Sequence, residues 1–165
     1  MGFYLATSKG FSPEIRFYIF TNMAFVKIWL HVVWGTKNRF PVLTESIRKE
    51  LYQHVRENAK QKQIHIDCIN GHVDHMHCLL CLNADMSIAK TMQLIKGEAA
   101  FWANKINLTK SKFEWADEYF AVSVSESQID RVREYILNQE EHHKKITFTQ
   151  EYERFIKNYR FKDQG

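Results

Sequence analysis

The chain has 165 residues, a length that suits one domain with its own hydrophobic core. Its formal net charge is +4 and its sequence pI is about 8.9, a mild basic bias that suits a polyanionic partner without requiring one. Three cysteines in no dense pattern exclude a disulfide framework and predict a reducing, cytoplasmic location.

The first part of the chain is apolar but interrupted by polar residues. The stretch 17–34 contains an asparagine, a lysine and a histidine, so we expect neither a membrane span nor a signal peptide there. Apolar residues alternate with others over 26–34, which predicts a strand. Residues 1–22 match no element, so we expect an N-terminal extension before a single domain over 23–165.

The next elements alternate between helical and extended patterns. Thr44 precedes apolar residues that recur every four positions, which predicts a helix. Ile64, Ile66 and Cys68 alternate with their neighbours and predict a second strand with these three side chains on one face. The segment 70–74 is typical of a hairpin connection into a third strand.

The second half of the chain repeats this alternation. A stripe of apolar residues over 88–102 predicts a second helix, and 119–125 predicts a fourth strand. Ser125 and Gln128 have the spacing of a capping box that opens a third helix, and an amphipathic stretch at 152–159 predicts a short C-terminal helix. This order of elements predicts an α+β, ferredoxin-like sandwich with an antiparallel sheet and packed helices.

Histidines gather in the segment "GHVDHMHCLL", residues 71–80. Because residues two apart in a strand share a face, His75 and His77 should lie side by side, about 6 to 7 Å apart along the strand. Two such imidazoles can converge on one metal ion, although paired histidines are also common as surface or hydrogen-bonded core groups. Cys78 and Cys81 fall on opposite faces, so we expect buried apolar residues there rather than zinc ligands.

A tyrosine and a glutamine stand four residues apart in "YILNQ". Their spacing places Tyr135 and Gln139 on one face of the third predicted helix. A boundary tyrosine and a solvated glutamine would have the same pattern. Beside the histidine pair, however, a tyrosine can be a nucleophile and a glutamine carbonyl can be a metal ligand.

These two motifs together resemble the single-tyrosine HUH-endonuclease transposases of small bacterial insertion sequences, the IS200-like and REP-associated tyrosine transposases. The resemblance rests on "DHMHCLL" and "YILNQ" and extends to "WGTKNR", "LIKGEAAFW" and "YFAVSVSESQIDRVREYILNQEEHHKK". It implies that Tyr135 is the nucleophile, forming a 5′-phosphotyrosine bond to DNA, and that His75, His77 and Gln139 bind Mg²⁺ or Mn²⁺. It also implies cutting and rejoining of single-stranded DNA with hairpins at the ends of the element. The expected assembly is a homodimer in which Tyr135 works in trans with the histidines of its partner.

Further residues receive candidate roles around this site. Asp74 is expected to orient an imidazole as a hydrogen-bond acceptor or to cap the turn. From residue 27 to 63 the chain holds 8 Lys or Arg against 3 Glu, net +5, so positive charge is locally concentrated, although a charge run can also be a solvated face. The candidate phosphate contacts are Lys37, Arg39, Lys96, Lys144 and Lys145. The apolar strand 26–34 is expected to offer an edge for the dimer.

Two other functions fit the same residues. A histidine-based metallohydrolase or nucleotide hydrolase would act on a small substrate and would not need Tyr135. A non-catalytic binder of single-stranded nucleic acid on the same scaffold would need neither a metal nor the tyrosine.

Overall fold

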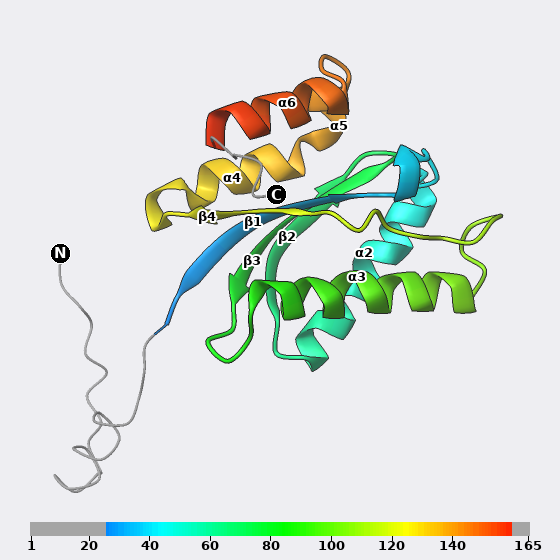
Figure 1. Ribbon diagram of the computed structural model, residues 1–165, viewed down its shortest axis with the longest axis horizontal. Coiled ribbons are helices and arrows are strands. Elements are labelled where there is room, and N and C mark those ends of the chain that lie inside the picture. Colours follow the sequence, from blue (N-terminus) through cyan, green and yellow to red (C-terminus); the bar gives the residue numbers. More distant parts are fainter. Residues whose placement is uncertain (1–25, 160–165) are drawn as a thin grey trace, which may run out of the picture.

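The computed structural model describes residues 26–159, which form a four-stranded antiparallel sheet with helices on both faces (Figure 1). The strands are β1 (Ile28–Gly35), β2 (His65–Gly71), β3 (His75–Leu82) and β4 (Phe120–Val124), in the order β2-β3-β1-β4. One face carries α2 (Glu45–Gln61) and α3 (Ile88–Lys105); the other carries α4 (Ile129–Leu137), α5 (Gln139–His143) and α6 (Phe148–Tyr159). The short 3₁₀ helices are η1 (Lys37–Arg39) and η2 (Glu126–Gln128). The expected ferredoxin-like α+β class is thus confirmed, while the expected extension 1–22 lies outside the described residues.

The face under α2 and α3 holds the main hydrophobic core. Alternation along β1 and β3 sends the buried side chains of Leu30, Val32, Trp34, Met76, Cys78 and Leu80 to this face. Thr44 and Ser87 begin the two helices, and each side-chain oxygen accepts a hydrogen bond from a backbone N–H of the first turn. The predicted strand over 26–34, the two helices and the core side of β3 are therefore confirmed.

Strand β2 departs from the predicted alternation because it contains a bulge. Ile66 pairs with Leu80 and Cys68 with Leu79, so Asp67 is an extra residue on the β2 side. The bulge turns Cys68 to the face under α4, while Ile64 and Ile66 stay with the main core. The expectation that Ile64, Ile66 and Cys68 share a face was therefore wrong.

The region around α4 differs from the sequence expectation at both of its ends. Ser125 precedes η2 rather than α4, and its hydroxyl lies 3.2 Å from that of Ser127 without capping a backbone N–H, so the predicted capping box was wrong. At the other end α4 stops at Leu137, and α5 begins at Gln139 after a break at Asn138. Tyr135 and Gln139 therefore lie on two consecutive helices, and the side-chain amide of Gln139 still donates a 3.3 Å hydrogen bond to the backbone oxygen of Tyr135.

The position of β1 in the sheet rules out its expected role as an exposed edge. It pairs with β3 on one side and with β4 on the other, so its backbone groups are already bonded within the chain. The edge strands are β2 and β4. Over the described part of the chain, no helix is both long enough and apolar enough to cross a membrane.

Candidate active site

Three histidines form a buried floor on the face of the sheet that α4, α5 and α6 cover. His75 and His77 come from β3 and His31 comes from β1, and all three are at most 3 % exposed. His31 Nε2 lies 3.1 Å from His77 Nδ1, at hydrogen-bond distance, because β1 and β3 are adjacent strands. His31 was not among the residues expected from the sequence.

The three helices supply the opposite wall of this site. α4 carries Tyr135, α5 begins with Gln139 and ends with His143, and α6 carries Glu151. The ring of Tyr135 lies with its centroid 5.8 Å from that of His77, edge to face. One chain therefore brings the tyrosine to the histidine pair, whereas the family resemblance implied the tyrosine of a partner.

Glu151 is the residue that joins the two walls. Its carboxylate accepts a hydrogen bond from the hydroxyl of Tyr135. The same carboxylate lies 3.2 Å from His143 Nε2, 3.7 Å from His75 Nε2 and 3.6 Å from His77 Nε2. His142 Nε2 lies 3.7 Å from it as well, so the tyrosine and four imidazoles surround one buried carboxylate.

These side chains fit a divalent metal ion. Ligand atoms of His75, His143 and Glu151 all lie within 4.8 Å of one another. Among the described residues, His77 Nε2 and Gln139 Oε1 are buried atoms without a hydrogen-bond partner. Such orphaned buried polar atoms are rare in native proteins, and a cation would satisfy them. The cluster could therefore bind a metal.

Burial within the site keeps the imidazoles of His31 and His75 neutral. Burial lowers the pKa of His31 to about 3 and that of His75 to about 4, so both rings offer a lone pair at pH 7. Burial alone would raise the pKa of Glu151, but the neighbouring imidazoles of His143 and His77 outweigh it and lower that pKa below its ordinary value. The result is a charged carboxylate among imidazoles, a donor set that suits a divalent cation.

The tyrosine holds its proton in this arrangement. Burial, and next to it the negative charge of Glu151, raises the pKa of the Tyr135 phenol above its ordinary value. A cation bound at the cluster would act in the opposite direction by stabilising the phenolate. The tyrosine and the cluster are therefore electrostatically coupled.

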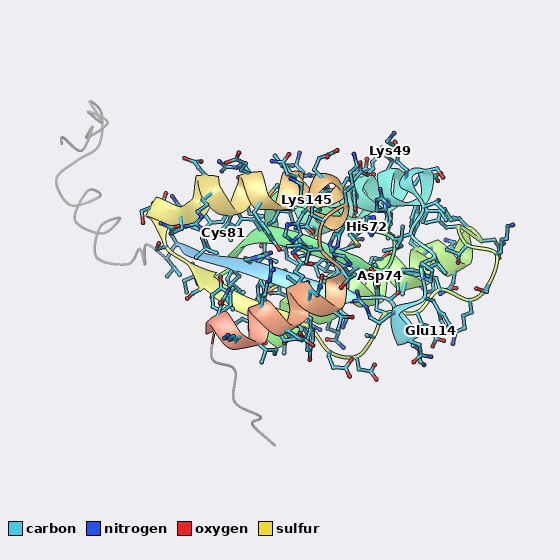
Figure 2. All side chains as sticks on the ribbon, turned by 90° about the horizontal axis from the view of Figure 1, so that it is seen from above. Lys49, His72, Asp74, Cys81, Glu114 and Lys145 are labelled. Atoms are coloured by element: carbon cyan, nitrogen blue, oxygen red, sulfur yellow. The ribbon has the colours of Figure 1, made fainter. Side chains whose placement is uncertain are left out.

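Asp74 fixes the orientation of His75. Its Oδ1 lies 2.7 Å from His75 Nδ1, and its Oδ2 accepts a 2.8 Å hydrogen bond from Arg39. Nδ1 of the imidazole therefore faces a carboxylate, which leaves Nε2 toward the cluster. Figure 2 labels Asp74 near the start of β3 and Cys81 toward its other end, so that cysteine is remote from the histidines.

Two of the candidate phosphate contacts have other partners in the structure. The Arg39 guanidinium pairs with Asp74, the residue that contacts His75, and lies 3.2 Å from the ring centroid of Phe148. Arg39 therefore helps to hold Asp74 in place. The ammonium of Lys96 donates to the backbone oxygens of residues 116, 117 and 118 at 2.8 to 3.2 Å, and burial lowers its pKa. Both side chains are engaged within the chain, where Lys96 secures the loop before β4, and their contacts with DNA stay predictions.

The other three candidates remain near the surface. Lys37 lies 3.5 Å from Glu114, and Lys144 lies 2.5 Å from Glu141. Lys145 lines a hollow of about 370 Å³ that also reaches Tyr135. Of the five, Lys145 is the one that the structure brings to the tyrosine.

The residues that sequence reasoning missed are His31, His143 and Glu151. His31 alternates correctly with the core residues of β1, so its face could have been deduced, but not its partner. His143 stands four residues after Gln139, a helical spacing that was available. Glu151 has no such signal, because its burial depends on how α6 folds back over the sheet (Figure 1).

Comparisons with known proteins agree with the family resemblance found in the sequence. A family model described as "Transposase IS200 like" matches residues 24–139, more than half of the chain. A protein of Deinococcus radiodurans R1, named as a candidate transposase, has a crystal structure that covers 70% of this chain and 93% of its own, with 25% identity and a TM-score of 0.57. A REP-associated tyrosine transposase bound to a REP hairpin covers 74% of this chain and 72% of its own, with 14% identity and a TM-score of 0.56. No curated protein sequence matches. The chain therefore belongs to the IS200-like transposase family and is a DNA transposase, an enzyme that cleaves and rejoins DNA.

Proposed function

We propose that this transposase cuts and rejoins single-stranded DNA through Tyr135. The phenolic oxygen attacks the scissile phosphorus, a bond to the DNA 5′ phosphate forms, and the bond to the 3′ oxygen breaks, which leaves a free 3′ hydroxyl after protonation. The reverse attack by a 3′ hydroxyl rejoins DNA without ATP, because the phosphotyrosine bond conserves the energy of the diester. The observation that carries the proposal is the Tyr135 hydroxyl bonded to Glu151 inside the histidine cluster.

The metal of this reaction is proposed to be Mg²⁺ or Mn²⁺. His75, His77 and Gln139 are the ligands implied by the family resemblance, and His143 and Glu151 lie in the same cluster. A bound cation screens the charge of the phosphodiester as a Lewis acid. Several imidazoles favour Mn²⁺ over Mg²⁺ in affinity, so we expect the stronger binding with Mn²⁺.

The chain's own residues prepare the nucleophile. Glu151 accepts the hydrogen bond of Tyr135 and so fixes the direction of its hydroxyl. Asp74 fixes the ring of His75, which in turn fixes one side of the cluster.

The proposed substrate is single-stranded DNA that carries a hairpin at the ends of the element. This extends to our chain what the REP-associated relative was seen to bind, together with the family of the chain. The basic residues near the tyrosine support a polyanionic substrate, with Lys145 in the hollow beside it.

The assembly is proposed to be a homodimer in which each chain can complete its own site, because Tyr135 and His77 meet within one chain. Mixing a His77→Ala protein with a Tyr135→Phe protein under conditions of subunit exchange tests this arrangement. With sites in cis every site keeps one defect and the mixture stays inactive. Recovery of cleavage would show that the sites are shared between protomers.

The chemistry is tested with labelled single-stranded DNA from both ends of the element, incubated with Mn²⁺ and separated on a denaturing gel. Wild type should give a protein band shifted by covalently attached DNA, and Tyr135→Phe should give none. Tyr119→Phe is the matched control, because Tyr119 packs against the main core. An adduct that persists in Tyr135→Phe would refute the proposal. Metal-dependent hydrolysis that does not need Tyr135 would instead indicate a metallohydrolase, and binding without cleavage would indicate a non-catalytic binder.

A further inference from the structure

A cleft of about 670 Å³ opens next to the histidine cluster, between the end of β4, α4 and α6. Its buried lining includes His31 and Glu151, and Tyr135 also lines it. The volume falls within the range of small-ligand sites, about 300 to 1,000 Å³. The cleft therefore has room for one part of a substrate that also reaches the tyrosine.

The side chains of this cleft combine positive charge with aromatic rings. Arg131 of α4 and Arg154 of α6 both line it, both are exposed, and neither forms an ion pair within residues 26–159. Phe155 lines the same cleft, with its ring centroid 5.5 Å from that of His31 and 4.8 Å from that of Tyr159. Unpaired arginines beside aromatic rings are typical of sites that bind single-stranded nucleic acid.

A second hollow also reaches the tyrosine. It has a volume of about 370 Å³ and is lined by Lys145, and it shares Arg131, Tyr135 and His142 with the cleft. A phosphodiester held at the tyrosine has one nucleotide on each side. The two spaces meet where that phosphodiester must lie.

We propose that the cleft between β4, α4 and α6 binds a nucleotide adjoining the scissile phosphate, with its base against Phe155 and its outer phosphate between Arg131 and Arg154. The inference rests on the proposed function, because it places the scissile phosphate at Tyr135. An unstacked base is required, so the cleft selects single-stranded over duplex DNA. Since every base has a flat face, this site contributes affinity and strand selection with little base preference.

The test measures binding of two fluorescein-labelled probes to full-length protein in a Tyr135→Phe background, so that cleavage does not consume the probe. One probe is a thymidine 12-mer, and the other is a 12-mer of abasic sites with the same number of phosphates. Phe155→Leu removes the ring but keeps an apolar side chain, and Arg154→Gln removes one charge. Lys157→Gln is the matched control, because Lys157 is exposed on the same helix and does not line the cleft.

Phe155→Leu should weaken binding of the thymidine probe by roughly 5- to 150-fold, the range of one lost base stack. Binding of the abasic probe should change by less than about twofold, because this probe has no base to stack. Arg154→Gln should weaken both probes and reduce the slope of log affinity against log salt by about 0.7. Lys157→Gln should leave binding of both probes within about twofold of the parent.

Equal losses on the two probes in Phe155→Leu, or a loss in Lys157→Gln as large as that in Arg154→Gln, would overturn the proposal. The first result would show a general effect on α6, and the second would show only a positive surface. Circular dichroism of each variant verifies that α6 is retained. Covalent adduct formation in proteins that keep Tyr135 is scored separately, so a failure of the cleft and a failure of the tyrosine chemistry give different results.

Discussion

The two faces of the sheet bury different chemistry from the same strands. Under α2 and α3, β3 contributes Met76, Cys78 and Leu80 to a continuous apolar core. Under α4, α5 and α6, the alternate positions of β3 contribute His75 and His77. The first face stabilises the fold by removing apolar area from water, whereas the second buries polar groups, which is unfavourable unless they find partners.

The difference is visible in how the helices are held. On the α4 side the apolar cluster is small, with Leu79, Cys68, Ile129 and Ile136 as its buried members. Polar links therefore help to attach these helices: Arg133 of α4 pairs with Asp67 of β2, and Arg48 of α2 pairs with Glu140 of α5. Individual ion pairs thus help to attach the helices on the face that carries the site. On the other face, the hydrophobic core holds α2 and α3 against the sheet.

The largest expected effect is on DNA cleavage, and it should be confined to substitutions on the face that carries the histidine cluster. His77→Ala should reduce DNA cleavage on the order of 10³-fold, because several kcal/mol of transition-state stabilisation depend on the metal that His77 helps to hold. Hairpin DNA binding, measured by gel shift, should be retained. His54→Ala is the control, since His54 stacks on Trp102 of the opposite helical layer. Equal loss of binding and cleavage in His77→Ala would indicate a DNA-contact or folding defect.

The next effect compares two adjacent leucines with fully buried side chains. Leu80 belongs to the main core and Leu79 to the small cluster under α4. Leu80→Ala should lower the free energy of unfolding by about 4 kcal/mol and Leu79→Ala by about 3 kcal/mol, as measured by urea denaturation. Only Leu79→Ala should also lower cleavage by the folded protein, because α4 carries Tyr135. A loss of cleavage confined to Leu80→Ala would contradict the division of roles between the faces.

This division also explains how much the sequence could predict. The side chains of the main core and the order of elements follow from period-2 and period-3.6 patterns, which depend on neighbouring residues. The bulge at Asp67 shifts that period within one strand, and nothing local in the sequence marks it. The pairing of β1 on both sides likewise depends on distant strands, so an edge inferred from its apolar residues was wrong.

The site was predictable only where its residues are local in sequence. His75, His77 and Asp74 lie within four positions, so their proximity follows from strand geometry. Glu151 reaches the cluster through the fold of α6, and its surroundings in sequence are those of an ordinary amphipathic helix. A carboxylate at such a position is normally solvated, and only tertiary packing buries it.

Metal binding should stabilise the face of the sheet that carries the histidine cluster. Mn²⁺ at 100 times its dissociation constant should raise the free energy of unfolding by about 2.7 kcal/mol, and EDTA should remove this gain. Glu151→Gln should weaken Mn²⁺ binding, measured by isothermal titration calorimetry, by roughly 10- to 100-fold. Glu153→Gln is the control, because Glu153 is exposed on the same helix. Unchanged Mn²⁺ affinity in Glu151→Gln would remove this carboxylate from the metal site.

The smallest expected effect concerns the polar link between β2 and α4. Arg133 donates two hydrogen bonds to Asp67, at 2.8 and 3.0 Å, and its side chain is 36 % exposed. An exposed bidentate pair contributes little, so Asp67→Asn should lower the free energy of unfolding by about 1 kcal/mol at pH 7. Asp130→Asn is the control, since Asp130 also pairs with Arg133 but is almost fully exposed, and its effect should stay below about 0.5 kcal/mol.

The pH dependence of this link has a definite sign. The hydrogen bond from Arg133 lowers the pKa of Asp67 in the folded chain, so the carboxylate binds its proton less readily when folded than when unfolded. Its contribution is therefore complete above the unfolded pKa, about 3.9, and is lost as the pH falls through the lower folded value. The difference in unfolding free energy between wild type and Asp67→Asn should stay constant from pH 7 to about 5 and then close toward pH 3. A difference that persists unchanged at pH 3 would mean that Asp67 positions α4 by its shape and hydrogen-bonding geometry rather than by its charge.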